Sequence, residues 1–216
     1  MEPSEAALNA KKAPSLLLPL AYFPPVPYFK LMLSYEQTVF DLHEHFHKQF
    51  YYNRCQIYSP NGILKLTIPI LHRHKRSSIK EVRISYEHDW RTIHWRSLQA
   101  AYRRSPYFEF YEHYFTPLFT DFKPEFLSEW NIKMIETINT ILGNKLNFSF
   151  TSEYSESHEN TEDRRLLAAP AELAKFSMDS KRYTQVFEEK HGFIGNLSII
   201  DLLFCEGPQS LEYLKN

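Results

Sequence analysis

Apolar residues in the N-terminal part of the chain gather into short runs of strand length. One run covers residues 15–21 and ends in a proline-rich turn at residues 22–27, and a second run covers residues 37–42. Between them, the apolar positions of residues 28–34 fall on one side of a brief helix. The pattern therefore predicts a strand, a helix and a strand in this order.

A turn signal, Ser-Pro-Asn-Gly at residues 59–62, separates two further strand-like segments. Residues 55–58 precede the turn, and residues 63–70 follow it. An Asn-Gly pair favours the positive backbone angles of a tight turn, so we predict an antiparallel hairpin here. The apolar positions of residues 79–84 predict one more strand.

From Asp89 onward the apolar positions recur with the period of a helix. Asp89 is a suitable cap for a helix over residues 90–103, and two more helices are predicted over residues 107–119 and 124–142. Gly143 stands where the residue after a helix end belongs. The middle of the chain is therefore predicted to be helical.

The order of these elements indicates a mixed α/β domain, for which an α+β arrangement is an alternative. Strands and a hairpin come first, a helical segment follows, and residues 146–150 suggest one late strand after it. We expect residues 1–14 to be a disordered lead and residues 15–216 to be one compact domain. The layout differs from the standard Rossmann fold.

Composition narrows the classes of function. The chain has 25 Lys and Arg against 26 Asp and Glu, a balance that argues against a general nucleic-acid binder. Its two cysteines, Cys55 and Cys205, form no CxxC motif. We find neither a signal peptide nor a stretch long enough to span a membrane, so we expect a cytoplasmic protein.

Glycine is scarce, with five residues in the whole chain. Neither the Gly-x-Gly-x-x-Gly loop nor the Gly-x-x-x-x-Gly-Lys loop occurs, so the sequence identifies no nucleotide cofactor. No Gly-x-Ser-x-Gly elbow is present either. The cofactor is left unknown.

Two histidine-rich segments are candidates for a metal site and a phosphate site. Strand alternation would place His43, His45 and His47 on one face as a metal triad, but an exposed polar strand face or a loop is the commoner explanation, and we assign no metal. Residues 72–76, His-Arg-His-Lys-Arg, suit either a phosphate site or a solvated loop.

His94 and Asp201 are titratable residues among apolar neighbours. His94 lies on the inward side of the predicted helix, where it is either a general base or a buried structural histidine. Asp201, within Ile-Ile-Asp-Leu-Leu, is either hydrogen-bonded for structural reasons or used with a shifted pKa. We retain both as candidate catalytic residues.

A second group of candidates suits the binding of an anionic substrate. Lys48 and Arg54 flank three aromatic residues and offer positive charge to a phosphate or carboxylate, unless they are ordinary surface cations. Aromatic faces stack on sugar rings, so tyrosines are candidates for a sugar cleft as well as for the core. The predicted substrate-binding residues are Tyr22, Tyr28, Asn53, Arg54 and Tyr102, with Lys48 added to the catalytic candidates.

Four blocks of the sequence resemble, in order, those of the WbqC-like family. The opening block is Tyr22-Phe-Pro24 with Tyr28-Phe-Lys30, and the central block includes Asn53-Arg54-Cys55 and Leu66-Thr-Ile-Pro69. The third block holds Trp90, His94-Trp95 and Ser105-Pro-Tyr-Phe108, and the closing block holds Asn196-Leu-Ser-Ile-Ile-Asp201 and Glu206-Gly-Pro208. One departure is Pro25-Val-Pro27, where many members have a Trp and a Gly.

The resemblance implies a bacterial transferase that modifies a sugar intermediate of O-antigen or capsule synthesis by an acyl, aminoacyl or sugar group. Its partners would be a small-molecule sugar and an activated donor. We expect Lys48, Arg54 and His94 to converge near the loop that contains Tyr22. A non-catalytic protein of the same pathway, which binds a sugar nucleotide or acts as a scaffold, is the alternative.

Overall fold

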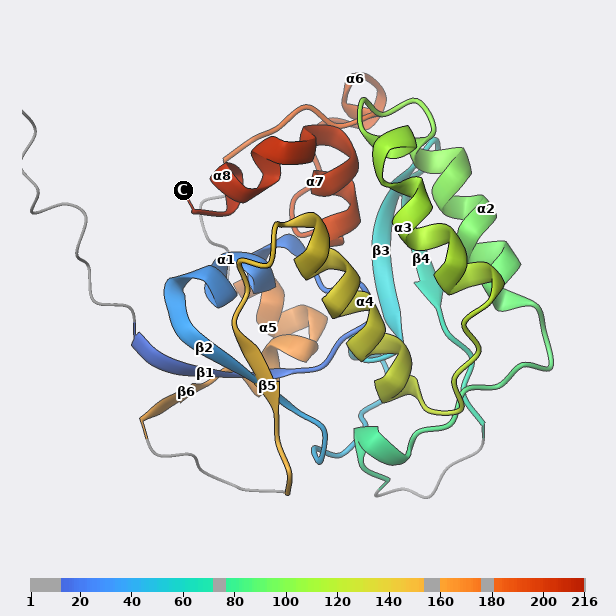
Figure 1. Ribbon diagram of the computed structural model, residues 1–216. Coiled ribbons are helices and arrows are strands. Elements are labelled where there is room, and N and C mark those ends of the chain that lie inside the picture. Colours follow the sequence, from blue (N-terminus) through green and yellow to red (C-terminus); the bar gives the residue numbers. More distant parts are fainter. Residues whose placement is uncertain (1–12, 72–76, 154–159, 176–180, 216) are drawn as a thin grey trace, which may run out of the picture.

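The computed structural model describes residues 13–71, 77–153, 160–175 and 181–215 (Figure 1). Most of the predicted N-terminal lead and the basic segment at residues 72–76 lie outside the described residues. The first described element begins at Ala13. The statements below refer to the described residues.

A four-stranded parallel sheet organises the fold. It consists of β1 (Ala13–Pro19), β2 (Tyr35–Asp41), β5 (Phe148–Phe150) and β6 (Thr161–Asp163), in the spatial order β5-β2-β1-β6. Leu16, Leu17 and Leu18 on the inner strand β1 are all buried. Successive strand residues point to opposite faces, so both faces of β1 are covered, as expected for a parallel sheet.

The chain order reverses within this sheet. The helix α1 (Val26–Ser34) connects β1 to β2, and β5 then pairs with the far side of β2. β6 instead pairs with the opposite side of β1. In open parallel sheets, ligands bind outside the carboxyl ends of the strands, at the point where the chain order reverses. The β1–β6 boundary is therefore the first place to look for a site.

The predicted hairpin is present. It pairs β3 (Arg54–Ser59) with β4 (Gly62–Thr67) in antiparallel register, with Ser59 opposite Gly62. Gly62 has a φ of 93°, in the left-handed region that glycine adopts without a steric penalty. The hairpin forms a sheet of its own, separate from the parallel one.

Three helices pack around the hairpin (Figure 1). They are α2 (Trp90–Tyr102), α3 (Phe108–Thr120) and α4 (Leu127–Ile141), and α3 contacts both of the others. Asp89 caps α2 as predicted, because its carboxylate accepts a hydrogen bond from the Thr92 amide at 3.3 Å. Their apolar sides meet around Trp130, which is fully buried.

Short elements complete the chain. They are the 3₁₀ helix η3 (Arg165–Ala168), α5 (Pro170–Lys175), α6 (Glu188–His191), α7 (Ile199–Glu206), the 3₁₀ helix η4 (Gly207–Gln209) and α8 (Ser210–Lys215). Helices α7 and α8 both pack against α1 (Figure 1). The backbone of residues 196–199 also joins the loop after β1, through bonds from Val26 N to Leu197 O and from Ile199 N to Pro24 O. The end of the chain thus covers the start of α1.

The mixed α/β class, the N-terminal strands, the hairpin and the three central helices are confirmed. The strand predicted over residues 79–84 is wrong. Its first part is the 3₁₀ helix η2 (Ile79–Glu81), which begins at Ser78 with a capping box to Glu81, and the rest makes only isolated bridges. Local capping outweighs the strand pattern there.

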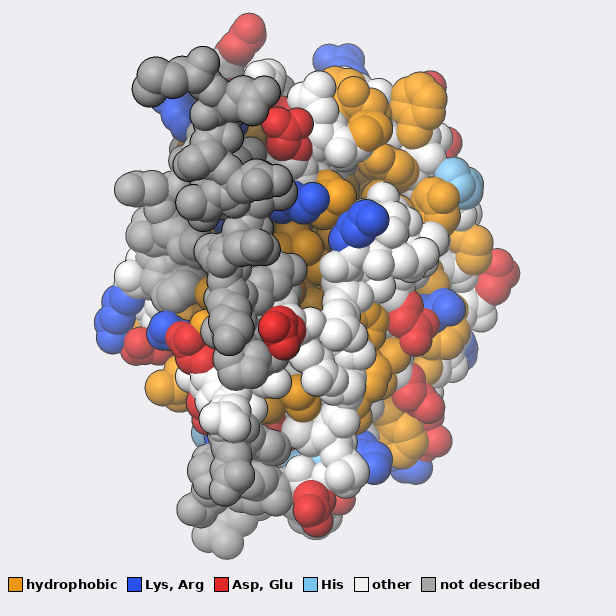
Figure 2. Space-filling view, turned by 60° about the vertical axis from the view of Figure 1, so that its left-hand side comes forward, with side chains coloured by type: hydrophobic (Ala, Val, Ile, Leu, Met, Phe, Trp, Pro, Cys, Tyr) orange, Lys and Arg blue, Asp and Glu red, His pale blue; other side chains and the backbone are white. Residues whose placement is uncertain are grey.

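Among the described residues, no helix is both long and apolar enough to cross a membrane. Acidic and basic side chains are interspersed over the described part of the face in Figure 2, with neither sign forming a continuous patch. This agrees with the balanced charge of the sequence.

Candidate functional site

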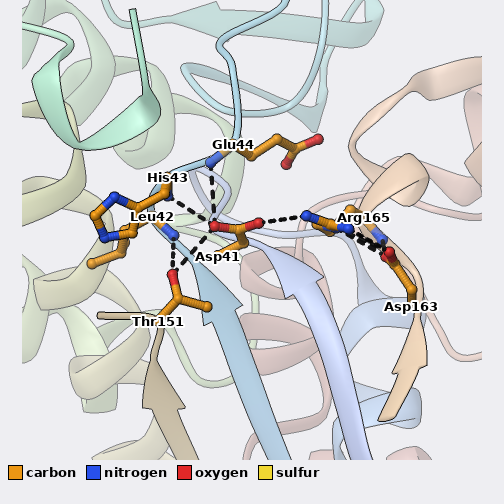
Figure 3. Close-up of polar contacts among 7 residues, drawn as sticks. All are labelled: Asp41, Leu42, His43, Glu44, Thr151, Asp163 and Arg165. Atoms are coloured by element: carbon orange, nitrogen blue, oxygen red, sulfur yellow. Dashed lines mark hydrogen bonds and ion pairs between the residues drawn. The ribbon is translucent and has the colours of Figure 1, made fainter. Parts of the chain in front are cut away.

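Polar side chains from three strands meet at the carboxyl ends of the parallel sheet (Figure 3). Asp41 is the last residue of β2, Thr151 follows β5, and Asp163 ends β6. Arg165 follows β6 and donates from Nη1 to Oδ2 of Asp41 at 2.8 Å and from Nη2 to Asp163 at 2.7 Å. The arginine therefore ties the outer strand β6 to β2, across the end of β1.

Asp41 is buried, with 1% of its side chain exposed, yet it is well paired. Oδ2 takes the Arg165 ion pair, while Oδ1 accepts from the amides of His43 at 2.8 Å and Glu44 at 3.2 Å. The Thr151 hydroxyl also donates to Oδ1 at 3.2 Å. These contacts bend the chain after β2 and position Glu44.

Glu44 belongs to a group of polar side chains that lack such pairing. Oε2 of Glu44 and the hydroxyls of Tyr28 and Tyr52 are buried atoms without a hydrogen-bond partner in the described chain. The charge of Glu44 raises the pKa of both tyrosines, in addition to the larger effect of burial, so the three groups lie close together. We call Asp41, Glu44, Tyr28, Tyr52 and Arg165 the edge cluster.

Burial raises the pKa of Glu44 from 4.5 to about 7, an interaction with the nearby Tyr52 hydroxyl offsets part of this rise, and the charge of Asp41 adds to it. A carboxyl group with a pKa near 7 exchanges a proton readily at neutral pH. Buried polar groups normally make hydrogen bonds, so a close set that lacks hydrogen bonds of ordinary geometry indicates a place for a polar ligand or water. The edge cluster therefore has the properties of a functional site.

The segment that contains Tyr51 and Tyr52 lies across the point where the chain order reverses. The Tyr22 amide, just after β1, donates to the Tyr51 carbonyl at 3.0 Å. The Tyr51 amide donates to the carbonyl of Ala168, in η3 just after β6, at 2.8 Å. Tyr51 thus joins the two loops at the β1–β6 boundary, while Tyr52 enters the edge cluster.

A pocket of about 350 Å³ opens beside Tyr51 of this segment. We call it the Arg54 pocket, and its lining residues are Gln49, Tyr51, Arg54, Cys55, Gln56, Lys65 and Pro170. The hairpin register places Gln56 opposite Lys65, so the outward face of the hairpin supplies the polar wall. The size falls within the range of small-molecule sites.

The chemistry of the Arg54 pocket favours an anion. Arg54 and Lys65 line it, and no carboxylate does. Nε of Arg54 is buried without a hydrogen-bond partner in the described chain, so the guanidinium has unused donors. Gln49 has a φ of 73°, a strained conformation for a non-glycine residue of the kind found at binding sites.

A model of the WbqC-like protein family matches residues 21–175. The chain belongs to this family. The match includes the edge cluster and the Arg54 pocket, whereas Asp201 lies beyond it. A curated relative, the uncharacterized protein Rv1507c of Mycobacterium tuberculosis, is 23% identical over 218 residues, which is 90% of this chain and 94% of the relative. No solved structure matches.

In this WbqC-like protein, His94 is buried, with 4% of the residue exposed. Its Nδ1 lies 3.0 Å from the Tyr22 hydroxyl, so these two predicted site residues are in contact. Burial lowers the pKa of His94 to about 4, which makes the imidazole neutral and weakly basic at pH 7. It is suited to hold the Tyr22 loop.

Asp201 and Tyr102 are also in contact, in a separate place. The fully buried Asp201 accepts hydrogen bonds from the Tyr102 hydroxyl at 2.9 Å, the Tyr183 hydroxyl at 2.6 Å and the Gln185 amide at 2.8 Å. We call these four residues the Asp201 network. Both carboxylate oxygens are occupied, and this suits a structural role.

The other predicted residues are spread over the site region. Arg54 lines the pocket, Tyr28 belongs to the edge cluster, and Lys48 is exposed on the turn before Gln49. The Asn53 side chain donates to the Ile68 carbonyl at 2.8 Å and supports the base of the hairpin. Convergence of Lys48, Arg54 and His94 stays a prediction, since neither Lys48 nor His94 lines the Arg54 pocket.

The strand alternation invoked for His43, His45 and His47 is wrong. These residues follow the end of β2 in bends and a single bridge, because the amides of His43 and Glu44 turn back onto Asp41. Within the described ranges, no group of three or more His, Cys, Asp or Glu side chains is arranged to hold a metal ion.

Sequence reasoning missed Asp41, Glu44, Lys65 and Arg165. Asp41 and Glu44 did carry a signal, because acidic residues directly after a buried strand lie at the edge where parallel strands end. Arg165 carried none, since β6 is three residues long and follows a polar loop. Its contact with Asp41 joins positions 124 residues apart.

Proposed function

We propose that this protein is a group transferase that acts on a sugar intermediate of bacterial surface-polysaccharide synthesis. The observation that carries the proposal is the adjacency of two unlike sites, a cation-lined pocket and a carboxyl group with a pKa near 7. Both flank Tyr51 and Tyr52 at the carboxyl edge of the parallel sheet. Transfer from an activated donor requires both an anion site and a proton acceptor.

The Arg54 pocket is suited to the anionic part of the donor. A guanidinium presents paired donors to a phosphate, and Lys65 adds a movable positive charge across the hairpin. Activated sugars and acyl-coenzyme A esters all carry phosphate. The adjacent Tyr51 offers an aromatic side chain for packing against a base or a sugar ring.

Glu44 is suited to activate the acceptor. As a general base it would take the proton from an acceptor hydroxyl or amine, which then attacks the donor while the leaving group departs with its electron pair. The unpaired hydroxyls of Tyr28 and Tyr52 supply donors and acceptors that match a sugar. At neutral pH, Glu44 is the stronger base of the two candidates, compared with His94.

A second function, binding of a sugar nucleotide without catalysis, is favoured by one observation. Cys55 is the thiol that lines the Arg54 pocket, and burial raises its pKa well above the ordinary value, so it is not an activated nucleophile. Covalent catalysis at this pocket would therefore lack an activated nucleophile. Direct transfer needs no such nucleophile.

Binding and turnover together test the proposal. Sugar nucleotides and acyl-coenzyme A esters are screened by thermal shift, and the best ligand is then titrated with Arg54→Met and with the exposed control Arg96→Met. We expect Arg54→Met to weaken binding about tenfold or more and Arg96→Met to leave it unchanged. Equal binding by all three proteins would contradict the donor site.

Glu44→Gln separates the two functions. It should retain donor binding but lower the rate of product formation, followed by mass spectrometry, by about 100-fold or more. Turnover that survives Glu44→Gln would remove Glu44 as the base. Donor binding by the unmodified protein, with no product from any amino or hydroxy sugar offered, would favour the non-catalytic function.

A further inference from the structure

A lysine in the middle of α1 has an unusual environment. Lys30 is 5% exposed, and its ammonium lies 4.6 Å from the centre of the Tyr213 ring. No acidic side chain forms an ion pair with it in the described chain. Burial of a charge without a counter-ion is costly, and a cation–π contact offsets only part of the cost.

Lys30 lines a narrow pocket where α1 meets the C-terminal segments. The other walls come from the rings of Tyr183, Phe193 and Tyr213 and from Asn196. The space inside is about 10 Å³, room for one water-sized group, so a single oxygen of a ligand can enter while the rest stays at the mouth. None of the lining residues is acidic, and none is shared with the Arg54 pocket.

Two further cations lie near the mouth of this pocket, and one of them is paired. Lys181 is exposed and close enough for its charge to lower the pKa of Lys30, in addition to the larger effect of burial. The Arg182 guanidinium lies 5.5 Å from the centre of the Phe193 ring, although Glu188 pairs with it. Arg182 is neutralised by Glu188, and Glu206 acts on Tyr213 from nearby. The attraction for an anion therefore comes from Lys30 and Lys181.

We propose that the Lys30 pocket binds the carboxylate of a small organic acid or of a peptide C-terminus. The ammonium of Lys30 pairs with the carboxylate, and the side-chain amide of Asn196 donates a hydrogen bond to it. The apolar group next to the carboxylate stays outside this narrow space, at the mouth beside the partly exposed Phe193 ring. One ammonium and one amide are too few donors for a phosphate, which in proteins collects several donors from arginines or backbone amides.

The site is independent of the proposed transferase activity. It uses a residue of the opening family-like block, Lys30, and one of the closing block, Asn196. The start of α1 is bonded to the segment before α7, and this brings the two blocks together. Asn196 has a φ of 58°, a left-handed conformation that asparagine tolerates better than most residues. Aspartate tolerates the same conformation, so Asn196→Asp can be tested without forcing a new backbone.

Isothermal titration with sodium benzoate tests the proposal, with sodium acetate and inorganic phosphate compared at constant ionic strength. The unmodified protein should bind benzoate saturably and more tightly than phosphate. Lys30→Met should weaken benzoate binding at least tenfold, while Lys133→Met, an exposed lysine that does not line the pocket, should not. No binding by the unmodified protein, equal binding by Lys30→Met, or a preference for phosphate would overturn the proposal.

Asn196→Asp provides a second variant in case Lys30→Met fails to fold. It adds a carboxylate beside the lysine, which should pair with the ammonium and exclude the ligand, again weakening benzoate at least tenfold. Unchanged benzoate binding by folded Asn196→Asp would contradict the site. A short peptide with a free C-terminus, compared with its amide, then distinguishes the source: tighter binding of the free peptide than of benzoate identifies a chain terminus, and the reverse identifies a small acid.

Discussion

The edge cluster and the Asp201 network contain the same kinds of residue but differ in whether their polar atoms are hydrogen-bonded. Each buries a carboxyl group with a raised pKa beside two tyrosines. In the Asp201 network, three donors occupy both carboxylate oxygens. In the edge cluster, Oε2 of Glu44 and the hydroxyls of Tyr28 and Tyr52 have no partner within the described residues.

The difference separates a structural centre from a binding centre. A saturated network joins α2 and α7 with the segment before α7, and a ligand could enter it only by breaking a bond that is already made. An unsaturated cluster costs stability until something pairs with it. The positions of the two groups in the fold support the same distinction between a structural and a binding centre. The edge cluster lies at the carboxyl ends of parallel strands, and the Asp201 network does not.

The largest effect that we expect is from Asp201→Ala. The change leaves the hydroxyls of Tyr102 and Tyr183 and the Gln185 amide without their acceptor, so the free energy of unfolding should fall by about 4 kcal/mol. Urea denaturation measures the loss. Asp121→Ala, an exposed control, should change stability by less than about 0.5 kcal/mol. A loss at Asp201 as small as the control's would show that the network is not structural.

Arg165→Met should produce the next largest effect. It leaves the buried Asp41 without its ion pair, while the amide and Thr151 bonds stay, and we expect a loss of about 3 kcal/mol in denaturant unfolding. Arg164→Met is the matched control, because Arg164 pairs with Glu162 at a largely exposed position and should cost at most about 1 kcal/mol. Similar losses for the two variants would contradict the anchoring role of Arg165.

The sequence predicted the scaffold better than the site. Periodicity alone located α2 and α4, because their many turns repeat the same apolar spacing. Arg54 lies on a hairpin set by its own turn residues and Tyr28 on a helix that leads away from β1, and their role in a site stays a prediction. The pairing of Arg165 with Asp41 and the unpaired state of Glu44 depend on how distant segments pack, which spacing along the chain does not report.

Glu44→Gln should change how stability depends on pH. The pKa of Glu44 rises from 4.5 to about 7 on folding, so its contribution is fully present below pH 4.5 and is lost as the pH rises through 7. The neutral amide avoids this loss. Relative to the unmodified protein, the variant should gain about 2 kcal/mol between pH 4.5 and pH 8, after allowance for partial exposure. Urea curves at several pH values measure the gain, and a constant difference would mean that Glu44 does not titrate near 7.

The smallest effects are the sharpest test of the comparison, because two Tyr→Phe changes remove the same atom from each region. The Tyr102 hydroxyl donates to Asp201 at 2.9 Å and accepts from the Tyr58 amide at 3.0 Å, so Tyr102→Phe breaks two buried hydrogen bonds and should cost about 1.5 kcal/mol. The Tyr52 hydroxyl lies near Glu44 but makes no hydrogen bond of ordinary geometry in the described chain. Tyr52→Phe should therefore leave stability unchanged or raise it by up to about 1 kcal/mol.

The important outcome is whether the two variants change the free energy of unfolding in opposite directions, since both side chains are fully buried and both variants keep the ring. If Tyr52→Phe were as damaging as Tyr102→Phe, the hydroxyl would be paired in solution, and the edge cluster would be a second structural network. If Tyr52→Phe is as stable as the unmodified protein but binds the sugar acceptor more weakly, the hydroxyl contributes to recognition rather than folding. A buried polar atom whose removal spares the fold and harms binding is the property that distinguishes the edge cluster from the Asp201 network.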